Sequence, residues 1–310
     1  MGMSWRPSWR TLGGWLLSTL AIAKAQAGPD RSRSLPEGGN DCFERPTDSQ
    51  RDSIAKYLAS EYAIAGADSV GRQNICRFAQ MLTEDPKLRS CADVYARKGQ
   101  ALAAFGLSDS GPPSDAEPLM KTLQIAKNPN PDGSYGPDFL SHDEFMAIND
   151  YTYRSGFRDM NIYLRADRKP VSPAMEAKVS RLIAALDKIK HPKKGPVYRG
   201  TRLPPEVRAA HKIGAVMTEK SFTSTSYVST GAHPGRDKFL IYNATAKGIS
   251  AYAGTTVEGE GYTIENEREV LFPPQTRFFV IDILREHPSL KEYRSGQGLH
   301  YTLAEMLPCE

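Results

Sequence analysis

The hydrophobic pattern of this 310-residue chain changes its period near Pro196, and this change limits the folds that the chain can adopt. Before Pro196, apolar residues recur three or four positions apart, as they do on one face of a helix. After it, short apolar or alternating runs are separated by turn residues, as in β-strands. Helices followed by a run of strands are typical of the α+β class, so we expect a helical N-terminal region and a β-rich C-terminal half.

Local signals place the helices and strands more closely. Residues 49–106 carry apolar side chains at helical spacing, and Ser141 with Glu144 has the sequence of a capping box at the start of a second helical block. Another helix is expected to start at Ser172, which Pro173 follows. The expected strands are 196–199, 214–218, 221–227, 238–243, 248–253, 267–272, 276–284 and 299–303.

Proline-rich residues 107–138 separate the two helical blocks. We therefore divide the chain into a helical N-terminal region at 28–117, a linker or long loop at 118–139, and a C-terminal domain with its tail at 140–310.

The first 27 residues have the features of a secretory signal peptide. Arg6 and Arg10 precede an apolar stretch at 11–23, and a small-residue motif ends at Ala27. The apolar stretch is too short to anchor the chain in a bilayer. We expect cleavage after Ala27 and a secreted protein.

Cleavage would leave a nearly neutral protein that spans no membrane. It removes Arg6, Arg10 and Lys24, so 37 basic side chains remain against 36 acidic ones, a net charge of +1. Such a balance gives no electrostatic reason to expect a nucleic acid as partner.

All four cysteines follow the expected cleavage site, which indicates two disulfides in an oxidising compartment. Three pairings are possible, and we favour Cys76–Cys91 with Cys42–Cys309, which would tie the tail to the N-terminal region. The cysteines and histidines lack metal-ligand spacing, so we expect no metal.

Three segments carry groups suited to chemistry on an anionic substrate. Arg199 ends a strand-like run and offers a planar fork of donors to a phosphate, while Gly200 after it lets a ligand approach the backbone. Taken alone, Arg199 is better explained as a surface residue in a salt bridge at a strand end. Ser224 lies in a serine- and threonine-rich strand whose hydroxyls can orient a ribose or a carboxylate, or merely decorate an edge strand.

The third segment contains Glu267 and Glu269, which would share one face of a regular strand about 7 Å apart. One carboxylate can stabilise a developing cation while the other accepts a proton from a nucleophile. The alternative is a solvated strand face.

The ordered set resembles the mono-ADP-ribosyltransferases of the Arg–Ser–Glu class over roughly residues 140–285. The strand at 222–226 is similar to the family's serine–threonine–serine strand, and Glu267-x-Glu269 is similar to its Glu-x-Glu loop. Residues 247–252 and the helix pair at 147–165 add to the resemblance. The family fold implies a core of two packed, mainly antiparallel sheets with flanking helices.

The resemblance implies a role for each matched residue. Arg199 would hold the NAD phosphates, and the Gly200 backbone would bind the nicotinamide amide. Ser224 would position the ribose and Glu269, the catalytic carboxylate. Glu267 implies arginine as the acceptor on a target protein.

The resemblance also implies partners. The chain would use NAD as co-substrate, and Tyr262 would contact the target protein. An exported transferase that acts in another cell needs a separate delivery partner.

Three other functions remain open. Glu267 and Glu269 are compatible with an inverting glycoside hydrolase, although such an enzyme needs no arginine for a diphosphate. Attack by water would give an NAD glycohydrolase. The fold could also serve a catalytically inactive binding protein.

Overall fold

The computed structural model describes most of the helices and strands that the sequence predicts. The described residues are 42–43, 49–66, 68–104, 129–190, 192, 194–233, 235–252, 268–284 and 298–309. The expected signal peptide at 1–27 and the two residues Tyr262 and Glu267 lie outside them.

The N-terminal helical region is confirmed and contains α1 (Gln50–Glu61), α2 (Ser69–Glu84), the short 3₁₀ helix η1 (Pro86–Leu88) and α3 (Arg89–Ala104). Polar side chains fix where these helices begin. Ser49 accepts a hydrogen bond from the Asp52 amide, and Asp68 accepts one from the Gly71 amide. Such caps satisfy amides that have no partner inside the helix.

A second group of helices contains α5 (His142–Thr152), α6 (Arg154–Arg165) and α7 (Pro173–Lys188). The capping box of Ser141 and Glu144 is present at α5, and Ser172 caps α7. Just before α5, Tyr135 stacks on Phe145 with ring centroids 4.4 Å apart. None of the helices that the structure describes has the length and hydrophobicity needed to cross a bilayer.

The strands of the described residues form one eight-stranded sheet in the order β2-β7-β8-β4-β1-β3-β6-β5. Their bounds are β1 (Gly195–Thr201), β2 (Val216–Glu219), β3 (Thr223–Ser226), β4 (Asp237–Asn243), β5 (Lys247–Gly248), β6 (Glu269–Phe272), β7 (Thr276–Leu284) and β8 (His300–Glu305). All pairs are antiparallel except β4 with β8. A short helix, α8 (Pro205–Ala210), follows β1.

The family resemblance led us to expect two packed, mainly antiparallel sheets, and the described strands provide two such layers as one continuous, mainly antiparallel sheet that folds over on itself. Phe272 of β6 and Phe278 of β7 lie near opposite ends of the strand order, yet their rings meet edge to face at 5.0 Å. A buried cluster with members from β1, β2, β4, β6, β7 and β8 fills the space between the two halves. The halves are joined at β1 and β3, which pair only at Tyr198 and Ser226.

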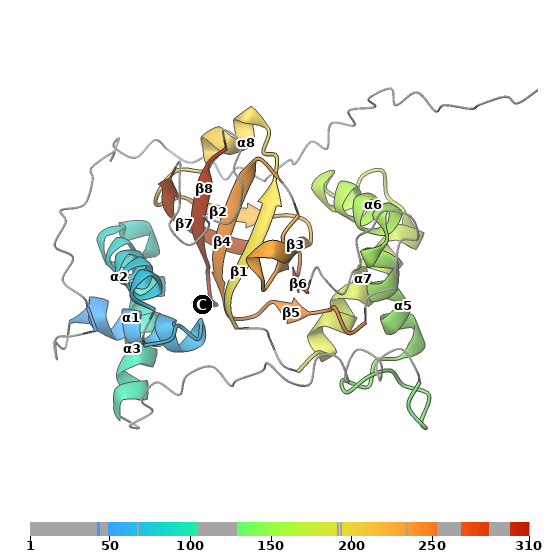
Figure 1. Cartoon of the computed structure of the whole chain (residues 1–310), viewed down its shortest axis with the longest axis horizontal. Coiled ribbons are helices and arrows are strands. Elements are labelled where there is room, and N and C mark those ends of the chain that lie inside the picture. The colour runs from blue at the N-terminus through green and yellow to red at the C-terminus, as the bar shows by residue number, and fades with distance from the viewer. Residues whose placement is uncertain are drawn as a thin grey trace, which may run out of the picture.

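Each group of helices covers a different outer part of this sheet (Figure 1). The α1–α3 group packs against β4, β7 and β8, where the Phe78 ring lies 4.7 Å from that of Phe279. The α5–α7 group packs against Phe222, Ile249 and Leu271 at the other end. The sheet is thus buried on both sides, and Arg199, Ser224 and Glu269 lie on strands at its centre and toward the second group.

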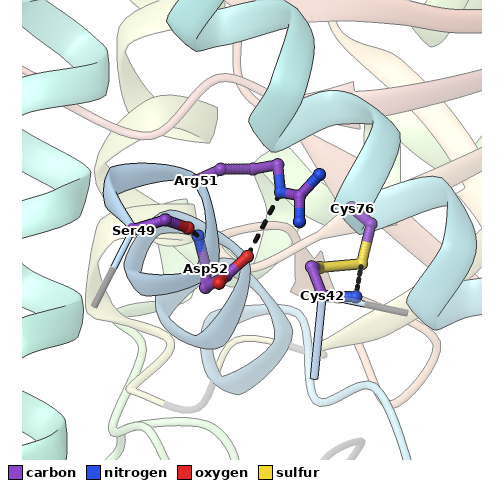
Figure 2. Close-up of a disulfide and its surroundings, with 5 residues drawn as sticks. All are labelled: Cys42, Ser49, Arg51, Asp52 and Cys76. Carbon is purple, nitrogen blue, oxygen red and sulfur yellow. Dashed lines mark hydrogen bonds and ion pairs between the residues drawn. A yellow bond between two sulfur atoms is a disulfide. The ribbon is translucent and has the colours of Figure 1, made fainter. Parts of the chain in front are cut away.

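The disulfide pairing differs from the one expected from sequence. The bonds are Cys42–Cys76, within the N-terminal region (Figure 2), and Cys91–Cys309, between α3 and the C-terminal tail. The tail is therefore tied to the N-terminal region as expected, but Cys309 is bonded to Cys91 rather than to Cys42. Tyr95 supports the same junction, since its hydroxyl donates to the Leu307 carbonyl at 2.5 Å.

Candidate active site

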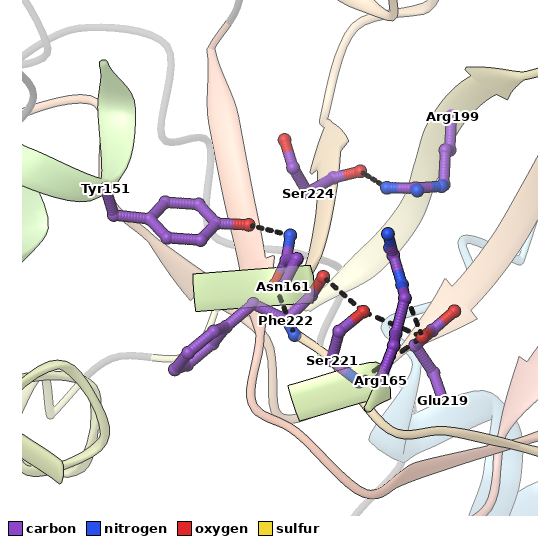
Figure 3. Close-up of polar contacts among 8 residues, drawn as sticks. All are labelled: Tyr151, Asn161, Arg165, Arg199, Glu219, Ser221, Phe222 and Ser224. Carbon is purple, nitrogen blue, oxygen red and sulfur yellow. Dashed lines mark hydrogen bonds and ion pairs between the residues drawn. The ribbon is translucent and has the colours of Figure 1, made fainter. Parts of the chain in front are cut away.

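Arg199 bridges the junction between the two halves of the sheet. Beyond the single pairing of Tyr198 with Ser226, β1 and β3 do not continue as a ladder. The half-buried Arg199 side chain crosses this gap, and its Nη1 donates to the Ser224 carbonyl oxygen at 2.6 Å (Figure 3). A charged side chain therefore takes the place of a missing strand–strand hydrogen bond.

Glu269 reaches the same junction from β6. It lies directly opposite Ser226 in the β3–β6 register, while Ser224 lies opposite Leu271. Ser224 is therefore a diagonal neighbour of Glu269, about 7–8 Å away between α-carbons and within reach of a long side chain. The structure thus brings Arg199, Ser224 and Glu269 together, and it adds Ser226 as the cross-strand partner that the sequence pattern did not single out.

The backbone around Glu269 is fixed by the turn after β5. The Glu269 carbonyl oxygen accepts hydrogen bonds from the Ile249 amide at 3.0 Å and from the Ser250 hydroxyl at 3.3 Å. Glu269 itself is buried, with 6% of its surface exposed. Burying a carboxylate costs free energy unless a nearby charge or hydrogen bond compensates. The burial of Glu269 is therefore a feature of the fold that needs such compensation.

The regular strand that we expected at 267–272 begins only at Glu269. Arg268 has a φ of 46°, in the left-handed region, and its guanidinium lies 5.5 Å from the centre of the Tyr227 ring. Side chains alternate between the two faces only along extended backbone. Because Arg268 is not extended, the alternation rule does not put Glu267 on the same face as Glu269. Glu267 itself lies outside the described residues.

Gly200 is explained by a close approach of protein backbone. A Cβ atom at this position would lie 1.9 Å from the His233 carbonyl oxygen and 3.0 Å from the Gly235 nitrogen. The loop after β3 therefore crosses directly over the residue that follows Arg199. The absence of a side chain at Gly200 leaves room for this loop. The expected binding of a ligand by the Gly200 backbone stays a prediction.

The sequence patterns did not assign roles to four residues that complete this polar group (Figure 3): Tyr151, Asn161, Arg165 and Glu219. Asn161 and Arg165 lie four positions apart on α6, a spacing that puts both side chains on one helix face. Arg165 Nε lies 4.0 Å from Glu219 Oε1, and the Ser221 hydroxyl donates to the same oxygen at 2.8 Å.

Charge and burial shift the ionisation of two of these groups. Burial lowers the pKa of Arg199, with Arg165 acting in the same direction and Glu219 and Glu269 opposing it. Burial also raises the pKa of Tyr151, and the charge of Glu269 raises it further. Two guanidinium groups and two carboxylates thus face one small region, an arrangement that can hold an anion next to a buried carboxylate.

Other candidate sites are weaker. A pocket at the ends of α5, α6 and α7 contains Asp150, Asp159 and Lys178, and none of Arg199, Ser224 and Glu269 lines it. Within the described part of the chain, no group of three or more histidine, cysteine, aspartate or glutamate side chains is arranged to hold a metal ion.

Curated relatives are similar to somewhat less than half of this chain. NAD(+)–protein-arginine ADP-ribosyltransferase Tre1 from Pseudomonas putida (strain GB-1) is 34% identical over 143 residues, which are 46% of this chain and 27% of that protein. The protein of the same name from Serratia proteamaculans (strain 568) is 30% identical over 148 residues, 48% of this chain and 30% of that protein. This chain thus spans less than a third of the length of these relatives.

Two solved structures with low identity are also similar. HopU1 of Pseudomonas syringae pv. Tomato, an ADP-ribosyltransferase, has 20% identity and a TM-score of 0.44, with 55% of this chain and 79% of that chain covered. The type III effector XopAI from Xanthomonas axonopodis pv. citri has 16% identity and a TM-score of 0.43, with 85% and 90% covered.

A family profile also matches this chain. The profile of the ADP-ribosyltransferase exoenzyme matches residues 120–294, which are more than half of the chain and include Arg199, Ser224 and Glu269. This chain therefore belongs to the ADP-ribosyltransferase exoenzyme family.

Proposed function

We propose that this protein transfers the ADP-ribose of NAD to an arginine side chain of a target protein and releases nicotinamide. The observation that carries the proposal is the convergence of Arg199, Ser224 and Glu269 from three strands within the family region. The names of the curated relatives, which are protein-arginine ADP-ribosyltransferases, support the acceptor type.

Arginine side chains would bind the diphosphate of NAD. The Arg199 guanidinium has five N–H donors, and its described hydrogen bond to Ser224 uses one nitrogen, Nη1. Arg165 supplies a second positive charge close enough to lower the pKa of Arg199. A bound diphosphate would relieve this repulsion, because it brings negative charge between two like charges. Backbone groups at Gly200 would bind the nicotinamide amide.

Glu269 would act on the bond between nicotinamide and ribose. Cleavage of an N-glycosidic bond passes through a cationic, loosely bonded transition state, as in glycoside hydrolysis. A carboxylate held in a buried position stabilises that cation more than it stabilises the uncharged ribose of the ground state. The Ser224 hydroxyl would position the ribose against this carboxylate.

Glu267 would prepare the acceptor. The guanidinium of an acceptor arginine is protonated and is a poor nucleophile, so a second carboxylate must orient it and accept its proton. Tyr262 would contact the target protein near the same place. If no acceptor is bound, water can attack the ribose instead, and the product is free ADP-ribose.

We also propose that the protein is exported after cleavage behind Ala27 and reaches its target through a separate delivery partner. The two disulfides, Cys42–Cys76 and Cys91–Cys309, support an oxidising compartment. Sequencing the N-terminus of the protein secreted by its producing cell tests the cleavage site.

Labelled NAD incubated with the protein and a cell lysate tests the proposed reaction. We expect ADP-ribose on arginine residues of one or a few proteins by mass spectrometry, together with stoichiometric nicotinamide. Free ADP-ribose without modified peptides would instead identify an NAD glycohydrolase. NAD binding without nicotinamide release would identify an inactive binding protein.

A further inference from the structure

One buried amide, that of Asn161, connects three parts of the fold next to the proposed active site. Asn161 lies on α6, and only 7% of its surface is exposed. Its Oδ1 accepts a hydrogen bond from the Phe222 amide at 3.1 Å, and its Nδ2 donates to the Tyr151 hydroxyl at 3.3 Å (Figure 3). The amide thus ties α5 and α6 to the residue that immediately precedes β3.

The direction of each hydrogen bond follows from the first one. A backbone N–H can only donate, so Phe222 must face the oxygen of the Asn161 amide. The amide nitrogen then faces Tyr151, and the Tyr151 oxygen must accept. The hydroxyl proton of Tyr151 is therefore directed away from Asn161 and is available to a second acceptor. The Phe222 amide thus fixes the orientation of the Tyr151 hydroxyl through the Asn161 side chain.

This connection leads directly to the proposed catalytic groups. Phe222 is two residues before Ser224, whose carbonyl oxygen holds Arg199 at 2.6 Å. The Tyr151 ring also packs edge to face on the Phe222 ring, with centroids 5.4 Å apart. Tyr151 is buried, and the charge of Glu269 acts on it strongly enough to be the second cause of its raised pKa. Tyr151 therefore keeps its proton throughout the physiological pH range.

We infer that Asn161 is a positioning residue for the proposed reaction: it fixes the start of β3, the strand that carries Ser224, and it orients the Tyr151 hydroxyl so that its proton points away from the Asn161 amide. The inference depends on the proposed function for its catalytic consequence. The geometry itself, with Asn161 between Phe222 and Tyr151, does not depend on NAD.

Two substitutions remove the connection in different ways. Asn161→Ala removes both hydrogen bonds, and Tyr151→Phe removes only the hydroxyl while it keeps the ring on Phe222. We expect each to lower kcat for nicotinamide release about tenfold, the effect of one hydrogen bond of about 1.4 kcal/mol, and to change KM for NAD far less. In the Asn161→Ala/Tyr151→Phe double variant the loss should be smaller than the sum of the two single losses, because part of the Asn161→Ala effect acts through the hydroxyl that Tyr151→Phe removes.

Asn161→Asp gives a readout that a purely structural role would not produce. An ionised aspartate still accepts from Phe222, but it forces the Tyr151 hydroxyl to donate back to it. A protonated aspartate offers one acceptor and one donor, as the amide does. We therefore expect the activity of this variant, divided by that of the wild type at the same pH, to recover as the pH falls.

The chain contains a matched control in a distant part of the fold. Asn74 Nδ2 on α2 donates to the Tyr242 hydroxyl at 3.0 Å, the same chemical pair as Asn161 with Tyr151. We expect Asn74→Ala to lower the melting temperature as Asn161→Ala does, with kcat unchanged. A folded Asn161→Ala variant with wild-type kcat, or Asn161→Asp with no recovery at low pH, would overturn the inference.

Hydrogen exchange separates this inference from the proposed function. If the wild-type protein neither releases nicotinamide nor modifies arginine, the proposed function fails. The positioning role is then tested by the hydrogen-exchange rate of the Phe222 amide. This rate should rise about tenfold in Asn161→Ala but not in Tyr151→Phe. Unchanged exchange in Asn161→Ala would contradict the positioning itself.

Discussion

At the scale of single residues, the proposed active site places charged groups where burial disfavours them. Burial lowers the pKa of Arg199, and Glu219 and Glu269 partly compensate through their negative charges. Glu269 is itself buried at the start of β6. Such groups cost stability, and under the proposed function a charged substrate would complete their interactions.

Glu269→Gln should abolish both transfer and NAD hydrolysis while NAD still binds. The amide keeps the shape of the side chain but not the charge that stabilises the ribosyl cation, so we expect kcat to fall at least about 100-fold. Calorimetric titration of NAD and a nicotinamide assay check the two parts. The exposed Glu206 on α8 provides a control as Glu206→Gln. Equal turnover in wild type and Glu269→Gln would contradict the assignment.

Glu267→Gln should have a different effect, because Glu267 is proposed to act on the acceptor. We expect transfer to arginine to fall about 100-fold or more, the range for loss of a general base, while NAD hydrolysis by water continues. Labelled NAD with agmatine or a target protein, with both products measured in one reaction, gives the ratio. A parallel loss of transfer and hydrolysis would remove the distinction between the two carboxylates.

At the scale of helices and strands, the sequence patterns located the described strands except β5, together with the helices of both helical groups, since local periodicity and caps are local properties. They failed where tertiary contacts intervene. The segment expected as a strand at 248–253 pairs only as β5 (Lys247–Gly248) and then turns at Ile249 to hold Glu269. The turn is set by contacts with β6, which the local pattern does not contain.

The end of β8 shows the same dependence on distant contacts. The buried Glu305 carboxylate accepts hydrogen bonds from the Ala244 amide at 2.8 Å, the Thr245 amide at 3.0 Å and the Thr245 hydroxyl. Burial raises the pKa of Glu305 above its ordinary 4.5, with these hydrogen bonds opposing the shift. A buried acid at a strand end thus fixes the turn that follows β4.

Glu305→Gln should leave the free energy of unfolding within about 1 kcal/mol of wild type at acidic pH, because a protonated carboxyl, like an amide, offers one acceptor and one donor. The folded protein binds the Glu305 proton more tightly than the unfolded chain does. That contribution is complete below pH 4.5 and is lost as the pH rises through the raised folded pKa. The free energy of unfolding of wild type should therefore fall relative to that of the variant as the pH rises toward neutral. Urea titrations between acidic and neutral pH measure this difference, and a wild type that gains stability relative to the variant over this range would contradict the assignment.

At the scale of the whole molecule, the N-terminal helices are held to the sheet by packing and by the Cys91–Cys309 disulfide. This bond joins residues 218 positions apart, whereas Cys42–Cys76 joins residues 34 apart. A cross-link that closes a longer loop restricts the unfolded chain more.

Replacing Cys91 and Cys309 together by serine should therefore cost about 2–4 kcal/mol of stability, and more than replacing Cys42 and Cys76. The proposed active site lies on the other end of the sheet, so we expect NAD turnover at low temperature to persist in both double variants. Denaturant titration and the nicotinamide assay check these two statements. A smaller loss at Cys91 and Cys309 than at Cys42 and Cys76 would show that the tail gains its stability from packing alone.

The sequence by itself determined the α+β order, the strands that carry Arg199, Ser224 and Glu269, and the helix starts at Ser141 and Ser172. Each of these depends on side chains a few positions apart, which local spacing records. Only the tertiary structure decided the disulfide pairing, the folding of one sheet into two facing halves and the contact of Arg199 with the Ser224 carbonyl. These features join segments that are distant in sequence, and the packing of the whole chain, rather than any local pattern, selects which of them meet.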